Sequence, residues 1–211
     1  MRFLITAGPT REPIDPVRYL SNRSSGKMGY ALADAALARG HEVILVSGPV
    51  SIRAPEGVTL VPVETAREMY DAVAETIAGA DVAIFCAAVA DYRVAEVADE
   101  KIKKTDESLT LTLVRNPDIL GSARNAFDFR GILVGFAAET EKLAEHALDK
   151  LRRKGCDLLA ANDVSRTDIA FDRDENEVEL FYKDGRREGL PLASKGQIAK
   201  EIIRRVEGLV E

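Results

Sequence analysis

The sequence predicts an α/β protein: a doubly wound, mostly parallel, Rossmann-like sheet with a C-terminal β-hairpin extension. Three observations lead to this fold class. Apolar, β-branched runs alternate with helical patterns along the chain, as in repeated βαβ units. The run at 81–89 is apolar almost throughout, which is typical of a central parallel strand buried on both faces. Near the C-terminus, two strand-like runs are joined by Asp184-Gly185, a favoured hairpin turn.

The first βαβ unit is expected within residues 3–47. Strands are predicted at 3–7 and 41–47, with a helix at 27–39 that ends at Gly40. Between the first strand and the helix lies a long polar insertion, where a dinucleotide-binding fold has a tight glycine turn. Its side chains are suited to holding anions and oxyanions: Arg11, Asp15, Arg18, Asn22 and Lys27.

The remaining elements complete the layers around the sheet. Thr65 and Glu68 have the spacing of a capping box at the start of the second helix. Pro117 suits the first turn of a short helix, and Thr140 and Gly155 begin and end the next one. Further strands are predicted at 58–62, 132–138 and 157–161, further helices at 65–78, 116–125, 141–154 and 194–210, and the hairpin at 177–192.

Residues 92–113 fit neither a strand nor a helix pattern. A basic run at 101–104 lies among polar residues, and every second residue from Leu109 to Leu113 is a leucine. We expect a flexible basic strap that leads into an edge strand, although a solvated charge run is the ordinary alternative for these lysines. Since the chain has no internal repeat, we expect residues 1–211 to form a single domain.

The composition is that of an ordinary globular protein. Of the 211 residues, 46% are hydrophobic and 30% are charged, which suits one domain with a full core. No apolar run could span a membrane, and strand-like sequence follows Met1 directly, leaving no room for a signal peptide. We therefore expect a cytoplasmic protein, with Cys86 and Cys156 as buried free thiols. The net charge of −6 argues against a general nucleic-acid binder.

Ligands of open parallel sheets bind at the carboxyl ends of the strands. In this chain those ends carry small residues that let a ligand approach the backbone. The helix that opens at Ser24-Ser25-Gly26 also offers free N–H groups to a phosphate. Close packing of helices on the sheet is the alternative reason for the small residues. The segments concerned are 8–10, 48–49, 87–91, 137–140 and 162–163.

A nicotinamide-dependent oxidoreductase is the main competing interpretation, and three absences count against it. No G-x-G-x-x-G follows the first strand, no acidic residue ends the second, and no tyrosine precedes a lysine by four positions. With two histidines and no Cys/His cluster in the sequence, a metal site built by the protein is poorly supported, so the metal ligands stay unknown. A non-catalytic nucleotide-binding module stays open as a second alternative.

Local basic groups are the positive indication of an anionic ligand. Lys150 and Lys154 lie one turn apart near the end of a predicted helix. They either complement the helix dipole or hold phosphate groups. A triphosphate needs several cations, with Mg²⁺ sharing the charge, and the lysines at 101–104 would supply more of them.

Seven short motifs occur in order along the chain: 6–13 (TAGPTREP), 21–29 (SNRSSGKMG), 87–92 (AAVADY), 101–104 (KIKK), 116–119 (NPDI), 135–140 (GFAAET) and 162–163 (ND). Together they resemble the phosphopantothenoylcysteine synthetase family, also called phosphopantothenate–cysteine ligases. The resemblance covers essentially the whole chain. It is to the bacterial type of this family, which joins 4′-phosphopantothenate to L-cysteine in coenzyme A biosynthesis.

The resemblance implies a ligase that uses CTP and Mg²⁺, forms an acyl-cytidylate, and releases CMP and pyrophosphate. It implies catalytic roles for Arg18, Asn22 and Lys101, with Asn22 stabilising an oxyanion or orienting the acyl-nucleotide. The substrate-binding residues would be Arg18, Asn22, Ser24, Gly26 and Ala88. The nucleotide-binding residues would be Phe85, Cys86, Ala87, Asp91, Lys101, Pro117, Asp118, Ile119, Leu120, Phe136, Lys150 and Lys154.

The resemblance also implies partners and a nucleotide. The match through 117–120 and the two helix lysines favours CTP over the ATP that eukaryotic members use. The family is dimeric, which suggests the hairpin at 177–192 as the dimerisation element. Many bacterial members are fused to a flavin-dependent phosphopantothenoylcysteine decarboxylase, so we expect such a partner, fused or separate. Nucleic acid and membranes are not expected as partners.

Overall fold

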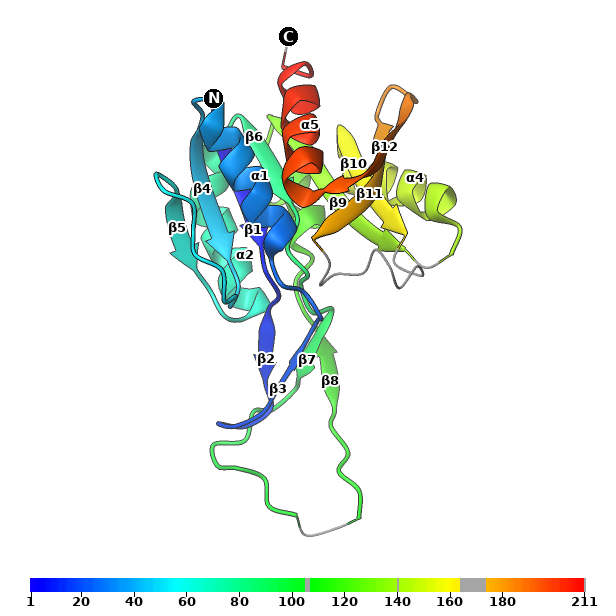
Figure 1. Cartoon of the computed structure of the whole chain (residues 1–211). Helices are drawn as coiled ribbons and strands as arrows, with labels where there is room; N and C mark the ends of the chain where they lie inside the picture. The colour runs from blue at the N-terminus through cyan, green and yellow to red at the C-terminus, as the bar shows by residue number, and fades with distance from the viewer. Residues whose placement is uncertain (105–106, 140, 164–173, 211) are drawn as a thin grey trace.

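The structure, a computed structural model, describes residues 1–104, 107–139, 141–163 and 174–210. Its centre is an eight-stranded sheet in the order β12-β11-β10-β9-β6-β1-β4-β5 (Figure 1). Six of these strands are parallel: β1 (Arg2–Ala7), β4 (Glu42–Ser47), β5 (Thr59–Pro62), β6 (Val82–Phe85), β9 (Ile132–Glu139) and β10 (Leu158–Asp163). The hairpin of β11 (Glu175–Tyr182) and β12 (Arg187–Ser194) adds two antiparallel strands beside β10. The predicted fold class is confirmed.

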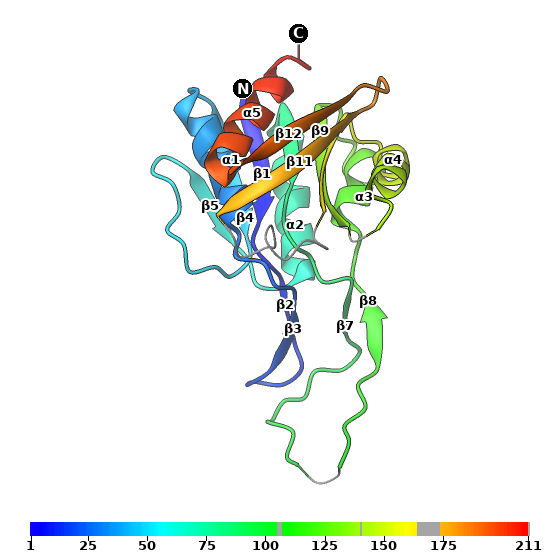
Figure 2. The ribbon, with the colours of Figure 1, turned by 45° about the vertical axis from the view of Figure 1, so that its right-hand side comes forward.

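Helices cover both faces of the sheet (Figure 2). On one face α1 (Lys27–Ala38) and α5 (Lys195–Glu207) share a core with Phe3 and Ile5 of β1. On the other face, α2 (Ala66–Thr76), the short 3₁₀ helix η1 (Ile77–Gly79), α3 (Ile119–Asn125) and α4 (Leu143–Lys154) pack around Leu4. Strand β1 is thus buried on both faces, as the near-continuous apolar pattern of a central strand requires. Among the residues described, no helix is long and apolar enough to cross a bilayer.

Two local predictions from turn and cap chemistry are confirmed. At the start of α2, Thr65 Oγ1 accepts a hydrogen bond from the Glu68 N–H at 3.2 Å, and Glu68 Oε2 accepts one from the Thr65 N–H at 3.3 Å. The hairpin turn also forms as expected, with Gly185 at φ 91°, in the left-handed region that glycine adopts without strain.

The boundaries of α3 and α4 differ from the prediction. Helix α3 begins one residue after Asp118, so Pro117 precedes the helix and is not in its first turn. The reason is that the Asp118 carboxylate caps the helix by accepting the Gly121 N–H at 2.9 Å. Helix α4 begins at Leu143, and Thr140, its predicted start, lies outside the described residues.

The apolar run at 81–89 forms a shorter strand than predicted. Strand β6 ends at Phe85, and the next residues leave the sheet. Two of their N–H groups turn to side chains: the Ala87 N–H donates to Thr6 Oγ1 at 3.2 Å and the Ala90 N–H to Thr10 Oγ1 at 3.0 Å, while the Cys86 and Ala88 N–H groups still donate to backbone carbonyls. An apolar sequence therefore becomes a shaped loop at the carboxyl edge of the sheet.

Two antiparallel ribbons extend from this carboxyl edge, away from both chain termini (Figures 1 and 2). The first ribbon, β2 (Arg11–Pro13) with β3 (Tyr19–Ser21), is built by the polar insertion. The second ribbon, β7 (Tyr92–Val94) with β8 (Leu113–Arg115), carries the basic strap between its strands. The predicted edge strand at the end of 92–113 is therefore wrong, because Leu113 pairs with Val94 in this ribbon and not with the main sheet.

A buried carboxylate joins the strap to the first ribbon. Asp15 Oδ2 accepts hydrogen bonds from Arg18 Nη2 at 2.5 Å and from the Ile102 N–H at 3.1 Å. Arg18 Nη2 also donates to the Ile102 carbonyl at 3.1 Å, so both polar groups of Ile102 are held. We call Asp15, Arg18 and the Ile102 backbone the Asp15 latch.

Candidate functional site

The parallel strands reverse their order of addition between β1 and β6. From β1 the chain adds β4 and β5 on one side, then returns to add β6, β9 and β10 on the other. The crevice outside the carboxyl ends at such a switch point is where open α/β sheets bind their ligands. The site is therefore expected between the end of β1, the end of β6 and the start of α1.

Some small residues at this edge are required by packing. A Cβ on Gly29 of α1 would lie 2.5 Å from the Ala7 Cβ, and a Cβ on Gly48 would lie 1.8 Å from the Pro9 carbonyl oxygen. Gly26, the residue before α1, has φ 77° and approaches Val50 closely. Close packing of a helix on the sheet, the alternative interpretation, accounts for Gly29 against Ala7, whereas at Gly26 and Gly48 one loop approaches another.

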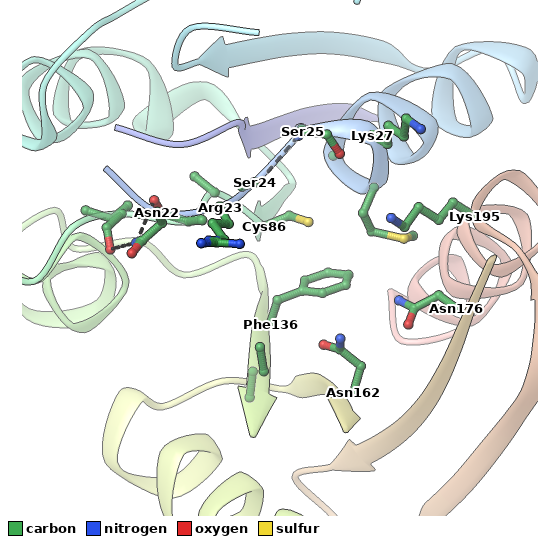
Figure 3. A pocket seen from close by; sticks show the side chains of 18 of the residues that line it. Asn22, Arg23, Ser24, Ser25, Lys27, Cys86, Phe136, Asn162, Asn176 and Lys195 are labelled. Atoms are coloured by element: carbon green, nitrogen blue, oxygen red, sulfur yellow. Dashed lines mark hydrogen bonds between the residues drawn. The ribbon is translucent and has the colours of Figure 1, made fainter. Parts of the chain in front are cut away.

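A first cavity, pocket A, has a volume of about 340 Å³ and opens beside the start of α1. Figure 3 shows Arg23, Phe136, Asn162 and Lys195 arranged around a common space. They come from the loop before α1, from β9, from β10 and from the first residue of α5. The lining residues are 22–29, 86–89, 136–138, Lys150, Asn162, Asn176 and Lys195.

A second cavity, pocket B, has a volume of about 590 Å³ and lies toward α3 and α4. Its lining combines aromatic and apolar groups with Asp91, Asp118, Arg115, Arg153 and Lys154. The full lining is Thr6, Met69, Phe85, Ala87, 89–92, 115–120, Phe136, Lys150, Arg153 and Lys154.

The two pockets share a wall formed by Ala87, Val89, Phe136 and Lys150. Lys150 reaches this wall from α4 and donates from Nζ to the Phe136 carbonyl at 2.7 Å. Its ammonium group thus lies where molecules in the two pockets would meet. A cation at that point would stabilise negative charge that moves between the two molecules.

The structure brings most of the predicted site residues together. Pocket B is lined by Phe85, Ala87, Asp91, Pro117, Asp118, Ile119, Leu120, Phe136, Lys150 and Lys154, and pocket A by Asn22, Ser24, Gly26, Cys86, Ala87, Ala88, Phe136 and Lys150. Arg18 and Lys101 line neither pocket. Arg18 lines a separate hollow of about 350 Å³ beside the strap, and Lys101 is exposed.

Asn22 is hydrogen-bonded to the backbone of the loop after β6. Its Nδ2 donates to the Ala88 carbonyl at 3.1 Å and to the Val89 carbonyl at 3.0 Å. Both amide hydrogens are therefore used within the protein, and in this state Asn22 holds the shared wall. Donation to an oxyanion, the role that the resemblance implies, would require the amide to exchange one of these partners.

An ion pair closes one side of pocket B. Lys154, whose side chain is only 10% exposed, pairs with Asp118 at the start of α3. Partial burial alone would raise the pKa of Asp118, but Lys154 and the Gly121 N–H outweigh it and bring the pKa below its usual range. Lys154 thus makes a specific contact, in addition to complementing the end of α4.

The cysteines are free thiols, as predicted, but they differ in exposure. Cys156 is buried in the core, whereas Cys86 is half-buried and lines pocket A. Burial raises the pKa of each thiol to about 12, although Lys195 opposes the shift at Cys86 and Lys150 does so at Cys156. Cys86 is therefore not an activated nucleophile in this pocket.

Several lining residues were missed by sequence reasoning. Asn176 and Lys195 belong to the C-terminal hairpin and helix, which the sequence analysis treated as an extension of the fold. They reach pocket A because the hairpin adds to β10 and α5 packs beside α1. Ser194, which caps α5, marks in the sequence where the helix starts, but no local pattern shows that this start lies at the pocket.

Residues that could hold a metal are sparse. In the described ranges, no group of three or more His, Cys, Asp or Glu side chains could hold a metal ion. Single carboxylates, Asp91 and Asp118, do line pocket B. Such an arrangement fits Mg²⁺ that arrives with phosphate ligands better than a cage built by the protein.

Comparison with known proteins gives a consistent set of relatives. A profile of the family described as "DNA/pantothenate metabolism flavoprotein C-terminal domain" matches residues 1–209. "Coenzyme A biosynthesis bifunctional protein CoaBC" of Vibrio vulnificus (strain YJ016) is 50% identical over 210 residues, which are 99% of this chain and 52% of that protein. The protein of the same name from Escherichia coli (strain K12) is 50% identical over 214 residues, covering 98% of this chain and 52% of that protein. The chain spans about half the length of these curated relatives.

The fold agrees with a solved structure of the same kind. The crystal structure of the C-terminal domain of Coenzyme A biosynthesis bifunctional protein CoaBC is 43% identical and superposes with a TM-score of 0.85. The superposition covers 99% of this chain and 95% of that one. The sheet, the ribbons and the hairpin therefore lie within the region that superposes on that crystal structure.

Proposed function

Since the chain belongs to the family of DNA/pantothenate metabolism flavoprotein C-terminal domains, we propose that it is a phosphopantothenate–cysteine ligase that uses CTP. The observation that supports this most is the pair of adjoining pockets with Lys150 in their shared wall, in a chain half identical to CoaBC proteins. A ligase that joins two molecules through an activated intermediate needs such adjacent sites. The activity of the other half of the CoaBC relatives is not assigned to this chain.

The reaction we propose has two steps. A carboxylate oxygen of 4′-phosphopantothenate attacks the α-phosphorus of CTP, the bond to the β-phosphate breaks, and pyrophosphate leaves. The cysteine amine then attacks the carbonyl carbon of the acyl-cytidylate, loses a proton, and expels CMP. Neither step needs a nucleophilic side chain, so the protein contributes by positioning the reactants and stabilising charge.

The two pockets divide the substrates between them in this proposal. Most residues assigned to the nucleotide line pocket B, where Lys154 and Arg153 supply positive charge. Most residues assigned to phosphopantothenate line pocket A, where α1 begins. Lys150, at the shared wall, would stabilise the α-phosphate under attack. Mg²⁺ would come bound to the triphosphate, and Asp91 and Asp118, the carboxylates in the lining of pocket B, would hold it there.

The dinucleotide alternative lacks its acidic residue at the end of β4, although a hollow of about 510 Å³ lies there beside Ser47 and Gly48. Ser47 ends β4, where dinucleotide-binding proteins have an Asp or Glu that binds the ribose hydroxyls. Its hydroxyl is hydrogen-bonded to the Tyr30 hydroxyl at 3.0 Å and to the Gly48 carbonyl. The segment at Gly48 packs directly against Pro9. We therefore do not retain oxidoreductase activity as a second candidate.

We also propose a homodimer, and exposed apolar residues favour the ribbons over the hairpin as its interface. Seven large apolar side chains are exposed on the two ribbons and the strap: Val17, Tyr19, Tyr92, Val97, Leu109, Leu113 and Val114. The hairpin exposes Leu192. A second copy of this chain would cover the larger set.

A half-reaction assay tests the proposed activity. The protein is incubated with 4′-phosphopantothenate, Mg²⁺ and each nucleoside triphosphate, with and without cysteine, and pyrophosphate is measured. We expect pyrophosphate release with CTP, and amide product in the presence of cysteine. Pyrophosphate release with ATP but not with CTP would overturn the assignment of CTP as the nucleotide. Absence of release with every triphosphate would overturn the proposed ligase activity.

Asn22→Ala gives a sharper test of the mechanism. Losing the amide should slow the second step more than the first, because the phosphate-binding lysines remain. Mass spectrometry of quenched reactions should then show an accumulated acyl-cytidylate. Asn125→Ala, the same change at an exposed residue that ends α3 and lines neither pocket, is the matched control.

A further inference from the structure

We propose that Thr10 is a positioning residue for the site: it fixes the wall between the two pockets without lining either of them. The consequence for activity rests on the proposed function, and the structural part does not. Thr10 follows β1 and is completely buried, with 0% of its surface exposed. From the sequence, Thr10 belongs to the small strand-end segment 8–10 and to the motif at 6–13, with no role of its own.

Thr10 holds the loop after β6 at two points. Its Oγ1 accepts the Ala90 N–H at 3.0 Å, and its own N–H donates to the Ala88 carbonyl at 3.4 Å. Ala88 also donates its N–H to the Gly8 carbonyl at 2.9 Å. The residues between these points include Val89, which belongs to the shared wall.

The third polar group of Thr10 reaches the first ribbon. The Thr10 carbonyl accepts the Ser21 hydroxyl at 2.8 Å. The next residue, Asn22, donates to the Ala88 and Val89 carbonyls. Thr10 is therefore bonded both to the loop after β6 and to Ser21, the neighbour of Asn22. A shift of Thr10 would move the loop and Asn22 together.

Burial makes the hydroxyl oxygen hard to replace. With Thr10 fully buried, water cannot take over the bond to the Ala90 N–H without a movement of the loop. A buried N–H without a partner is costly, so the loop would move to find one. Because the loop backbone forms the wall between two reactants, a small movement there would misalign them.

Two substitutions separate this hydrogen bond from packing. Thr10→Val keeps the shape of the side chain and removes the oxygen, whereas Thr10→Ser keeps the oxygen and removes a methyl group. We expect Thr10→Val to lower kcat/KM for pyrophosphate release about 10- to 100-fold, and Thr10→Ser to stay within about threefold of the parent. Both variants are expected to melt at a lower temperature than the parent. If Thr10 acted through stability alone, kcat/KM would follow the melting temperature in both variants and would not depend on the hydroxyl.

Hydrogen exchange tests the structural half independently of any activity. The Ala90 amide should exchange faster in Thr10→Val than in Thr10→Ser, measured well below both melting temperatures. Equal exchange in the two variants would overturn the positioning role, even if the parent is an active ligase. Faster exchange in Thr10→Val with kcat/KM unchanged would overturn the link to catalysis. If the parent releases no pyrophosphate, the ligase fails, and the exchange comparison still decides the role of the hydroxyl.

Discussion

The doubly wound body and the pair of ribbons hold their residues in place by different means. In the body, β1 is buried on both faces and two apolar cores flank the sheet. In the ribbons, apolar side chains are exposed, and the strap is tied through the Asp15 latch. Burial fixes many residues at once, whereas a latch depends on a few directional bonds. Substitutions should therefore act globally in the body and locally in the ribbons.

The largest effect is expected in the body, at Arg124. Its guanidinium pairs with Asp157 at 2.6 Å and donates to the Phe129, Gly131 and Gly155 carbonyls. Arg124→Ala would leave the mostly buried Asp157 carboxylate with the weaker partner Lys183, at 3.4 Å, and would remove the donor of three carbonyls. The free energy of unfolding should therefore fall by about 3 kcal/mol. Urea unfolding measures this. Arg130→Ala, which breaks a neighbouring exposed pair with Asp128, should change it by less than about 0.5 kcal/mol.

The next effect is expected in the ribbons, at the latch. Asp15→Asn removes the charge that holds Arg18 and weakens the acceptor of the Ile102 N–H. Hydrogen exchange across 98–104 should accelerate, while the melting temperature stays nearly constant. The KM for the proposed substrate 4′-phosphopantothenate should rise if Arg18 binds it, because the latch orients Arg18. Asp99→Asn, on the exposed strap, is the control. A large fall in melting temperature would show that the ribbons are part of the cooperative body.

The pH dependence of the latch follows from the sign of its pKa shift. The bond from Arg18 is the main cause that holds the pKa of Asp15 well below its usual range, against the effect of burial. Because the pKa is lowered, the ionised Asp15 carboxylate stabilises the latch fully above the pKa of an ordinary Asp, about 4. This stabilisation is lost as the pH falls through the lowered pKa. Exchange across 98–104 should thus show no latch opening between pH 8 and pH 5.

A smaller effect separates ligand binding from helix stability in α4. Lys154→Gln and Lys150→Gln should raise the KM for CTP, with losses in stability of at most about 1 kcal/mol. Arg152→Gln, exposed in the same last turn, removes the same charge from the helix end and should leave the KM unchanged. If all three variants lose the same stability and show an unchanged KM for CTP, the two lysines only stabilise the C-terminal end of α4.

The smallest effect on the monomer is expected at its exposed apolar residues. Val17→Ser and Leu109→Ser should change the free energy of unfolding by less than about 0.5 kcal/mol. If a second copy covers the ribbons, sedimentation should show dissociation of both variants. Leu192→Ser, on the hairpin, should remain dimeric. If this variant dissociates and the other two do not, the dimer interface is the hairpin at 177–192.

The body could be predicted from the sequence and the ribbons could not. Periodicity placed the strands and helices of the body because burial on one or both faces leaves a repeating apolar pattern. Short strands such as β3 and β8 leave no such pattern, since they pair over three residues and expose apolar side chains such as Tyr19 and Leu113. The end of β6 was missed for a related reason: Thr6 and Thr10 lie far from it in the sequence.

The same contrast holds for the candidate site. Most predicted residues gather in the two pockets because strand ends converge at one edge of the sheet. Arg18 and Lys101 do not, because their positions depend on the latch and the ribbons. The contribution of α5 through Lys195 depends on long-range packing that no local pattern encodes.

The raised pKa of the two cysteines would have a consequence for cysteine, the thiol that we propose as a substrate. At pH 8, a thiol with a pKa of about 12 is ionised in about one molecule in ten thousand. Disulfide exchange proceeds through the thiolate, so Cys86 would rarely attack oxidised cysteine entering the site. Thiol reagents should consume free cysteine long before they label the protein. The formation of a mixed disulfide between Cys86 and a sulfur compound in pocket A should therefore be slow.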